Sequence, residues 1–171
     1  MKEVVPGIFQ IEEKGAPALG TIKPPENIYV IAGPDALIFD AGYGNRKTVN
    51  YVVEQLQEIK ELYKERGEPF KATRILPSHW HPDHSSGLKP LKESLGVKVM
   101  MTEKTRDILK SKKSFREHFE PQDAQEEMLR IRNRWRRLQD KIQHFLWWRF
   151  YRRVYGLNFI DEPDEIIPNG T

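Results

Sequence analysis

The feature that most constrains this chain is a short stretch rich in side chains that bind metals. Residues 78–84 read Ser-His-Trp-His-Pro-Asp-His, so three of the five histidines and one aspartate fall within six positions. Imidazole and carboxylate groups crowded around one point favour a divalent metal ion between them. The sequence therefore predicts a metal site here, and the alternative is a histidine-rich surface turn without function.

The spacing within this stretch predicts two adjacent metal positions. His79 and His81 are two residues apart and project to the same side of an extended backbone. Pro82 biases His81 toward that extended conformation. Asp83 and His84 are adjacent in sequence and can address a second point. Each metal position would take two ligands from this stretch.

The first hundred residues have the pattern of an α/β fold. Residues 46–66 carry apolar side chains every three or four positions, which predicts a helix with Asn45 as N-cap and Gly67 as C-cap. Two β-rich runs separated by Gly33-Pro34-Asp35 are typical of a hairpin, and their near-continuous apolar character favours strands covered on both faces. We expect strands at 7–11, 27–32, 36–40, 72–76 and 97–101, and a second helix at 85–95. The strand at 72–76 leads directly into the histidine cluster.

The character of the chain changes after residue 102. Residues 103–157 carry a net charge of +7, while the rest of the chain carries −4. This segment lacks strand signals, and we expect helical turns at 105–110 and a long helix at 122–155. Strand fragments are expected at 158–160 and 165–167. The sequence thus predicts three parts: 1–102, a helical insertion or lid at 103–157, and a final part at 158–171.

Composition limits the cellular setting. The chain has no cysteine, which excludes disulfides and a thiolate-bound zinc. No apolar h-region follows the first residues, and no run of about 18 apolar residues occurs. We therefore expect a cytoplasmic location.

The motif His79-x-His81-x-Asp83-His84, after a strand and before a helix, resembles the signature of the metallo-β-lactamase superfamily. Two upstream segments are also similar to that family. Residues 27–32 (NIYVIA) resemble its first hairpin, and residues 37–42 (LIFDAG) resemble its first acidic motif. The resemblance covers about residues 5 to 101. It implies a metallo-β-lactamase-like αββα sandwich, incomplete and present mainly as its N-terminal half, with a helical insertion.

The resemblance also implies roles for individual residues. His79 and His81 would bind a first metal ion, and Asp83 and His84 a second. Asp40 would orient ligands without binding metal, and Asp83 would also act in catalysis by taking up a proton. The implied cofactor is Zn²⁺, as one or two ions, with iron or manganese as alternatives.

The sequence departs from the family pattern in its later part. Members supply a third histidine, a bridging aspartate and a further histidine from the second half of the fold, and none has a counterpart here. His118 and His144 lie in predicted helices without partners at ligand spacing. We expect both to be ordinary helix histidines.

The implied function is that of a zinc-dependent hydrolase acting on a small molecule. In such an enzyme a metal-bound hydroxide attacks a thioester, ester or related bond, as in glyoxalase II-like members. The alternative from another class is a catalytically inert fragment or binding module that lacks the remaining ligands. A nuclease of this fold and a mononuclear iron dioxygenase are lesser alternatives.

The basic and aromatic stretch at 130–155 admits several interpretations. The favoured one is an amphipathic helical hairpin that also serves as a lid over the site. Contact with an anionic membrane or lipid is an alternative, and nucleic-acid binding is not favoured. A second copy of the chain or a C-terminal half are the remaining partner hypotheses, because the metal site needs further ligands.

Overall fold

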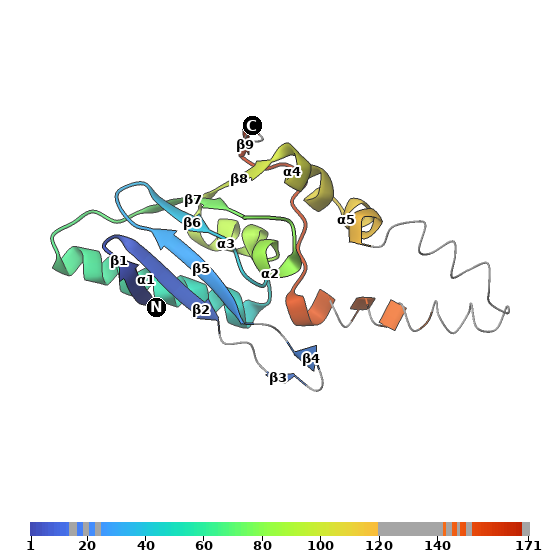
Figure 1. The fold of residues 1–171 in the computed structure, drawn as a ribbon, viewed down its shortest axis with the longest axis horizontal. Helices are drawn as coiled ribbons and strands as arrows, with labels where there is room; N and C mark the ends of the chain where they lie inside the picture. The colour runs from blue at the N-terminus through green and yellow to red at the C-terminus, as the bar shows by residue number, and fades with distance from the viewer. Residues whose placement is uncertain are drawn as a thin grey trace.

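A mixed seven-stranded sheet forms the centre of the molecule, in the order β1-β2-β5-β6-β7-β8-β9 (Figure 1). The structure is a computed structural model that describes residues 1–13, 17–18, 21–22, 25–119, 142, 145–146, 148–149 and 152–168. The sheet strands are β1 (Lys2–Val5), β2 (Ile8–Glu13), β5 (Glu26–Ile31), β6 (Ala36–Phe39), β7 (Ala72–Leu76), β8 (Lys98–Thr102) and β9 (Glu165–Ile167). A separate two-stranded pair consists of β3 (Pro17–Ala18) and β4 (Thr21–Ile22).

The sheet changes from antiparallel to parallel at β6. The predicted hairpin is confirmed, since β5 and β6 pair antiparallel with Tyr29 opposite Phe39. From β6 onward, β6–β7, β7–β8 and β8–β9 are all parallel. Parallel neighbours need crossover connections, and helices supply the first two. The carboxyl ends of β6 and β7 therefore lie side by side, which places Asp40 next to the histidine cluster.

Five helices follow in the fully described part, and sequence signals account for most of their ends. They are α1 (Arg46–Glu65), α2 (Pro82–Ser85), α3 (Leu88–Leu95), α4 (Glu103–Leu109) and α5 (Lys112–Phe119). The predicted N-cap is confirmed, because the side chain of Asn45 accepts the N–H of Thr48 at 3.1 Å. Gly96 ends α3 in the left-handed conformation, with φ of 68°.

Helix α2 was not expected from the sequence. Pro82 disfavours a helix that runs through it, yet it occupies the first position of α2. Proline suits that position because its missing N–H would have no helical partner there. Asp83 and His84 thus lie in a helical turn and not in an extended loop.

The core lies between the sheet and helices α1 and α3. Alternate strand residues such as Ile28, Val30 and Ile38 are fully buried and pack against the apolar stripe of α1. Their neighbours on the other face are less buried, and Ile31 is 47% exposed. The expectation that β5 and β6 are covered on both faces is therefore wrong for this structure, which follows the alternation of a sheet with one covered face.

Helices α4 and α5 follow β8, and the chain returns to the sheet at β9 (Figure 1). The predicted turns at 105–110 correspond to α4, and α5 follows. The long helix predicted at 122–155 lies mostly outside the described residues, although 152–155 are helical. The strand predicted at 158–160 is absent, and the N–H of Ile160 instead donates to the carbonyl of Leu109 at 3.1 Å. The fragment predicted at 165–167 is β9.

The described helices include none that is both long and apolar enough to cross a membrane.

Candidate metal centre

The histidine cluster lies at the carboxyl end of β7 and leads into α2. His81 has φ of −59° and ψ of 147°, which is the extended conformation expected before proline. The hydroxyl of Ser85, a buried residue, donates to the carbonyls of Trp80 and His81, each at 2.9 Å. These bonds fold α2 back onto the loop and hold the cluster in a compact turn.

The structure brings the four predicted ligands together in two pairs. Nε2 of His79 lies 2.9 Å from Nδ1 of His81, and Oδ2 of Asp83 lies 3.5 Å from Nε2 of His84. Two nitrogen ligands of a tetrahedral zinc ion lie about 3.3 Å apart, given bonds of about 2.0–2.1 Å. The first pair would therefore separate by only a few tenths of an ångström to accept an ion. Metal binding by these four residues stays a prediction.

Asp40 connects the ends of β6 and β7 from a strained backbone position. Its φ of 68° makes it the one non-glycine residue with positive φ in the described part of the chain. Its buried carboxylate accepts the N–H of Ser78 through Oδ1 at 2.6 Å. Oδ2 lies 3.0 Å from Nδ1 of His84. Its bond to Nδ1 leaves Nε2 of His84 facing Asp83, and the role of Asp40 in orienting a metal ligand stays a prediction.

The protonation of the cluster follows from these contacts. Burial alone would raise the pKa of Asp40, but hydrogen bonds from His84 and Ser78 outweigh burial and hold that pKa below its usual value. The bond to Asp40 raises the pKa of His84 above its usual value, against the effect of burial. Burial, together with the neighbouring His84 and His81, lowers the pKa of His79. The lowered pKa of His79 favours the neutral ring that a metal ion needs, whereas the raised pKa of His84 favours its protonated ring.

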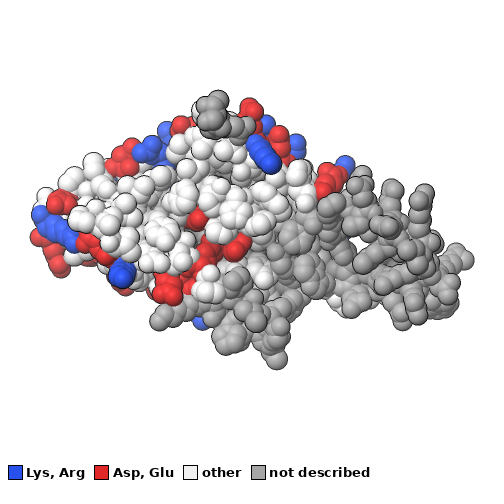
Figure 2. All heavy atoms as spheres, viewed as in Figure 1, with Lys and Arg blue, Asp and Glu red and all other residues white. Residues whose placement is uncertain are grey.

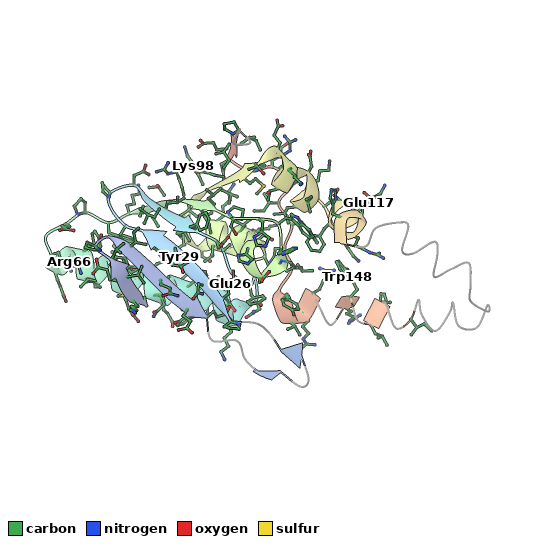
Figure 3. The ribbon with its side chains drawn as sticks, viewed as in Figure 1. Glu26, Tyr29, Arg66, Lys98, Glu117 and Trp148 are labelled. Carbon is green, nitrogen blue, oxygen red and sulfur yellow. The ribbon has the colours of Figure 1, made fainter. Side chains whose placement is uncertain are left out.

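Two residues that the sequence did not single out contribute to the cluster. Ser78 Oγ lies 2.9 Å from Nδ1 of His79, which leaves Nε2 of that ring facing His81. Glu26, the first residue of β5, is only 4% exposed, and its Oε1 lies 3.5 Å from Nδ1 of His84. The signal for Glu26 was present, because it shares the strand face of the buried Ile28 and Val30. Figure 3 labels Glu26, and Figure 2, drawn from the same side, shows acidic atoms gathered in the same central region of the molecule.

The described residues do not contain a complete set of ligands for a catalytic zinc ion. No group of three or more His, Asp or Glu side chains in that part of the chain is arranged to hold a metal. Catalytic zinc sites use three protein ligands, and each pair here supplies two. His118 lies exposed on α5 with Nδ1 3.0 Å from the carbonyl of Ser114, as expected of an ordinary helix histidine. His144 lies outside the described residues.

The segment around residue 155 packs against the loops beside the cluster. The ring centroids of Tyr43 and Tyr155 are 5.2 Å apart. Burial, followed by the nearby carboxylate of Asp83, raises the pKa of both phenols. A Cβ on Gly44 would lie 2.2 Å from the carbonyl oxygens of both Gly156 and Ser86. Only glycine fits there, so the helical segment and the cluster meet backbone to backbone.

Comparison with known families identifies the family of the chain. The family model described as the metallo-beta-lactamase superfamily matches residues 23–153. The chain belongs to the metallo-beta-lactamase superfamily. The predicted family and its mixed α/β fold class are thereby confirmed. No curated protein sequence matches the chain.

Several solved metallo-beta-lactamase structures resemble the chain over part of their length. A metallo-beta-lactamase from Pontibacter korlensis is 23% identical, with a TM-score of 0.46, covering 61% of this chain and 44% of that one. A metallo-beta-lactamase family protein from Thermus thermophilus is 22% identical, with a TM-score of 0.46, covering 75% and 38%. One from Hirschia baltica is 18% identical, with a TM-score of 0.45, covering 60% and 42%. This chain spans less than half the length of each.

Proposed function

We propose that this chain carries the first metal ligands of a zinc-dependent hydrolase that acts on a thioester, ester or related bond of a small molecule. The observation that carries the proposal is the pairing of donor atoms at the end of β7. His79 Nε2 faces His81 Nδ1 at 2.9 Å, and Asp83 Oδ2 faces His84 Nε2 at 3.5 Å. Membership of the metallo-beta-lactamase superfamily supports a metallo-hydrolase role for this arrangement.

The residues fit zinc as two half-sites. His79 and His81 would hold one ion, and Asp83 and His84 the other. When bound, zinc lowers the pKa of a water molecule and polarises the bond under attack. Asp83 has a partly exposed carboxylate and can also take up the proton that the water loses. Asp40 and Ser78 fix which nitrogen of His84 and His79 points into the site.

A second candidate function follows from the ligand count. Two ligands per ion among the described residues favour weak metal binding, so the isolated chain could serve as a binding module without turnover. The two functions differ in one observable property. A hydrolase needs ligands beyond these four, from other parts of this chain or from another chain, whereas a binding module does not.

Zinc titration of the purified chain tests the metal site. We expect weak binding in which His79→Ala loses one ion and His84→Ala loses the other, because each substitution leaves one half-site with a single ligand, and the double variant should bind no zinc. His118→Ala is the matched control, since His118 bonds only within α5 among the described residues. Protein that stays metal-free at micromolar zinc would refute the site.

A hydrolysis panel then separates the two functions. Thioesters, lactones, phosphodiesters and β-lactams are incubated with the zinc-loaded chain, and its oligomeric state is measured in parallel. We expect little or no turnover by the monomer. Turnover that His84→Ala removes and His118→Ala preserves would establish the hydrolase and reject the binding module.

A further inference from the structure

A pocket of about 540 Å³ lies between α5, the loop after β6 and the helical residues before Gly156. Of the described residues that line it, four are cationic, three are apolar, and the remaining three are two glycines and an asparagine. They are Lys112, Arg149, Arg152 and Arg153; Phe145, Trp148 and Leu157; and Gly44, Gly156 and Asn158. This basic pocket, as we call it, has the size of a site for a small organic molecule.

The positive charge of the basic pocket is not offset by its own lining. Among the residues that the structure describes, no carboxylate lines it, and none of its four cations has an ion-pair partner. Elsewhere the same residue types are paired, as Lys92 is with Asp164 at 2.6 Å. Four like charges around one hollow raise the local concentration of anions.

Aromatic groups lie directly beside these charges. Trp148 is 4% exposed, and Lys112 Nζ lies 5.9 Å from the centroid of its ring. Arg116, just outside the lining, lies 5.7 Å from the same ring. Phe145 is 61% exposed and offers an apolar surface at the pocket. A ligand that suits this lining has a highly charged anionic group attached to an apolar part. Figure 3 shows Trp148 beside α5, far from Arg66 at the other end of the molecule.

The basic pocket adjoins the candidate metal centre. The side-chain N–H of Asn158 donates to the carbonyl of Ser86 at 3.4 Å, and Ser86 follows His84 by two residues. Gly44 belongs to the pocket and touches the backbone of Ser86. The pocket therefore lies beside the turn that carries the candidate metal ligands.

We propose that the basic pocket binds the phosphate groups of a small organic phosphate, and that these form the non-reacting end of the substrate. Arginine forks match phosphate oxygens in pairs, and three of the four cations are arginines. A pocket of about 540 Å³ matches the size of a small organic phosphate, whereas a duplex or a bilayer would need a larger surface. Phosphate binding by the pocket does not depend on the hydrolase function. Its role as the non-reacting end of the substrate does rest on that function.

The test measures anion binding in the absence of metal. Full-length chain is treated with chelator, dialysed, and titrated with pyrophosphate and with a nucleoside diphosphate by calorimetry at fixed ionic strength. We expect saturable binding of both ligands. The nucleoside diphosphate should bind more tightly than pyrophosphate, because its base can pack on the apolar lining of the pocket. Arg152→Gln with Arg153→Gln should weaken binding about tenfold or more, since each removes a charge-assisted hydrogen bond.

Controls separate pocket binding from general charge. Lys60→Gln with Lys98→Gln removes two positive charges from exposed sites on α1 and β8 and should change the affinity less than twofold. Lys112→Gln repeats the test from a different element in case the double arginine variant does not fold. Equal losses in pocket and control variants, no binding by the wild type, or tighter binding of an oligonucleotide or anionic vesicle would each overturn the proposal.

A variant of the metal centre shows whether pyrophosphate binding depends on the histidine cluster. His84→Ala should bind pyrophosphate as the wild type does, although it loses the zinc ion that Asp83 and His84 would hold. Loss of pyrophosphate binding in that variant would assign the anion to the histidine cluster and overturn the pocket. Failure of zinc binding with pyrophosphate binding intact would reject the hydrolase and leave the basic pocket standing.

Discussion

Asp40 Oδ2 lies 3.0 Å from Nδ1 of His84, and Oδ1 of the same carboxylate accepts the N–H of Ser78 at 2.6 Å. One buried side chain therefore fixes both the backbone at the start of the cluster and the ring at its end. Asp40 directly follows β6, whereas the cluster follows β7. The geometry of the cluster therefore depends on how these two parallel strands are aligned.

Replacing Asp40 with asparagine should lower zinc affinity about 10- to 100-fold. The amide keeps the size of the carboxylate but loses the charge that orients His84 and favours its proton on Nδ1. Competition with a chromophoric chelator measures the change, and circular dichroism checks the fold. Asp35→Asn, at an exposed aspartate in the β5–β6 hairpin, is the control. An unchanged affinity in Asp40→Asn would show that the ring is held by other contacts.

The pairing of Asp40 with His84 should stabilise the metal-free chain most between about pH 4 and pH 6.5. The lowered pKa of Asp40 gives stability that is present above its unfolded value and is lost as pH falls. The raised pKa of His84 gives stability that is complete below its unfolded value and is lost as pH rises through the folded value. Thermal unfolding of wild type and His84→Gln should therefore differ more at pH 5.5 than at pH 8.5. A difference in Tm that is constant with pH would contradict the pairing.

Removing the hydroxyl of Ser78 should weaken zinc binding about tenfold while leaving the fold intact. In Ser78→Ala the hydrogen bond from the backbone N–H of residue 78 to Asp40 remains. His79 loses its contact with the hydroxyl oxygen 2.9 Å from Nδ1, which sets the tautomer and orientation of the ring. Zinc titration measures the loss. Ser111→Ala, which removes a hydroxyl before α5, serves as control. Equal affinity in the two serine variants would mean that Ser78 does not orient the ring.

Gly156→Ala should destabilise the chain more than Gly96→Ala, although both glycines have nearly the same backbone conformation. Their φ angles are 64° and 68°, so the backbone strain from adding a Cβ is similar, at about 1 kcal/mol. At Gly96 nothing lies within 4 Å of the added atom, whereas at Gly156 the backbone N of Asn45 would lie 2.1 Å away. We expect an extra cost of about 1–3 kcal/mol in Gly156→Ala from overpacking, measured by urea unfolding. A similar decrease in the free energy of unfolding in both variants would show that the backbone around Gly156 shifts at little cost to accommodate the added Cβ.

Local patterns predicted most of the fold because each depends on neighbours in sequence. The apolar run around Ile28 and Val30, the turn at 33–35 and the helical stripe after Asn45 all predicted elements that formed, although the apolar run did not predict that only one face is covered. The strand expected at 158–160 failed for the opposite reason. The backbone of Ile160 bonds to Leu109, about fifty residues away, and no local pattern reports such a partner.

The candidate site was predicted where the motif was dense and missed where the contact was distant in sequence. His79 to His84 stood out because their spacing is itself unusual. Glu26 reaches His84 across the sheet, from a strand more than fifty residues earlier. The basic pocket likewise combines α5 with residues that follow the helical segment, so composition could indicate its charge but not its shape.

The contact between Gly44 and Gly156 also restricts how the chain can change. When two side chains collide, a smaller residue at one position can usually accommodate a larger one at the other. Here the clash involves backbone atoms on both sides, and both residues are already the smallest available. No second substitution at this pair can rescue the first, so the junction between the helical segment and the metal loop has no compensating variant.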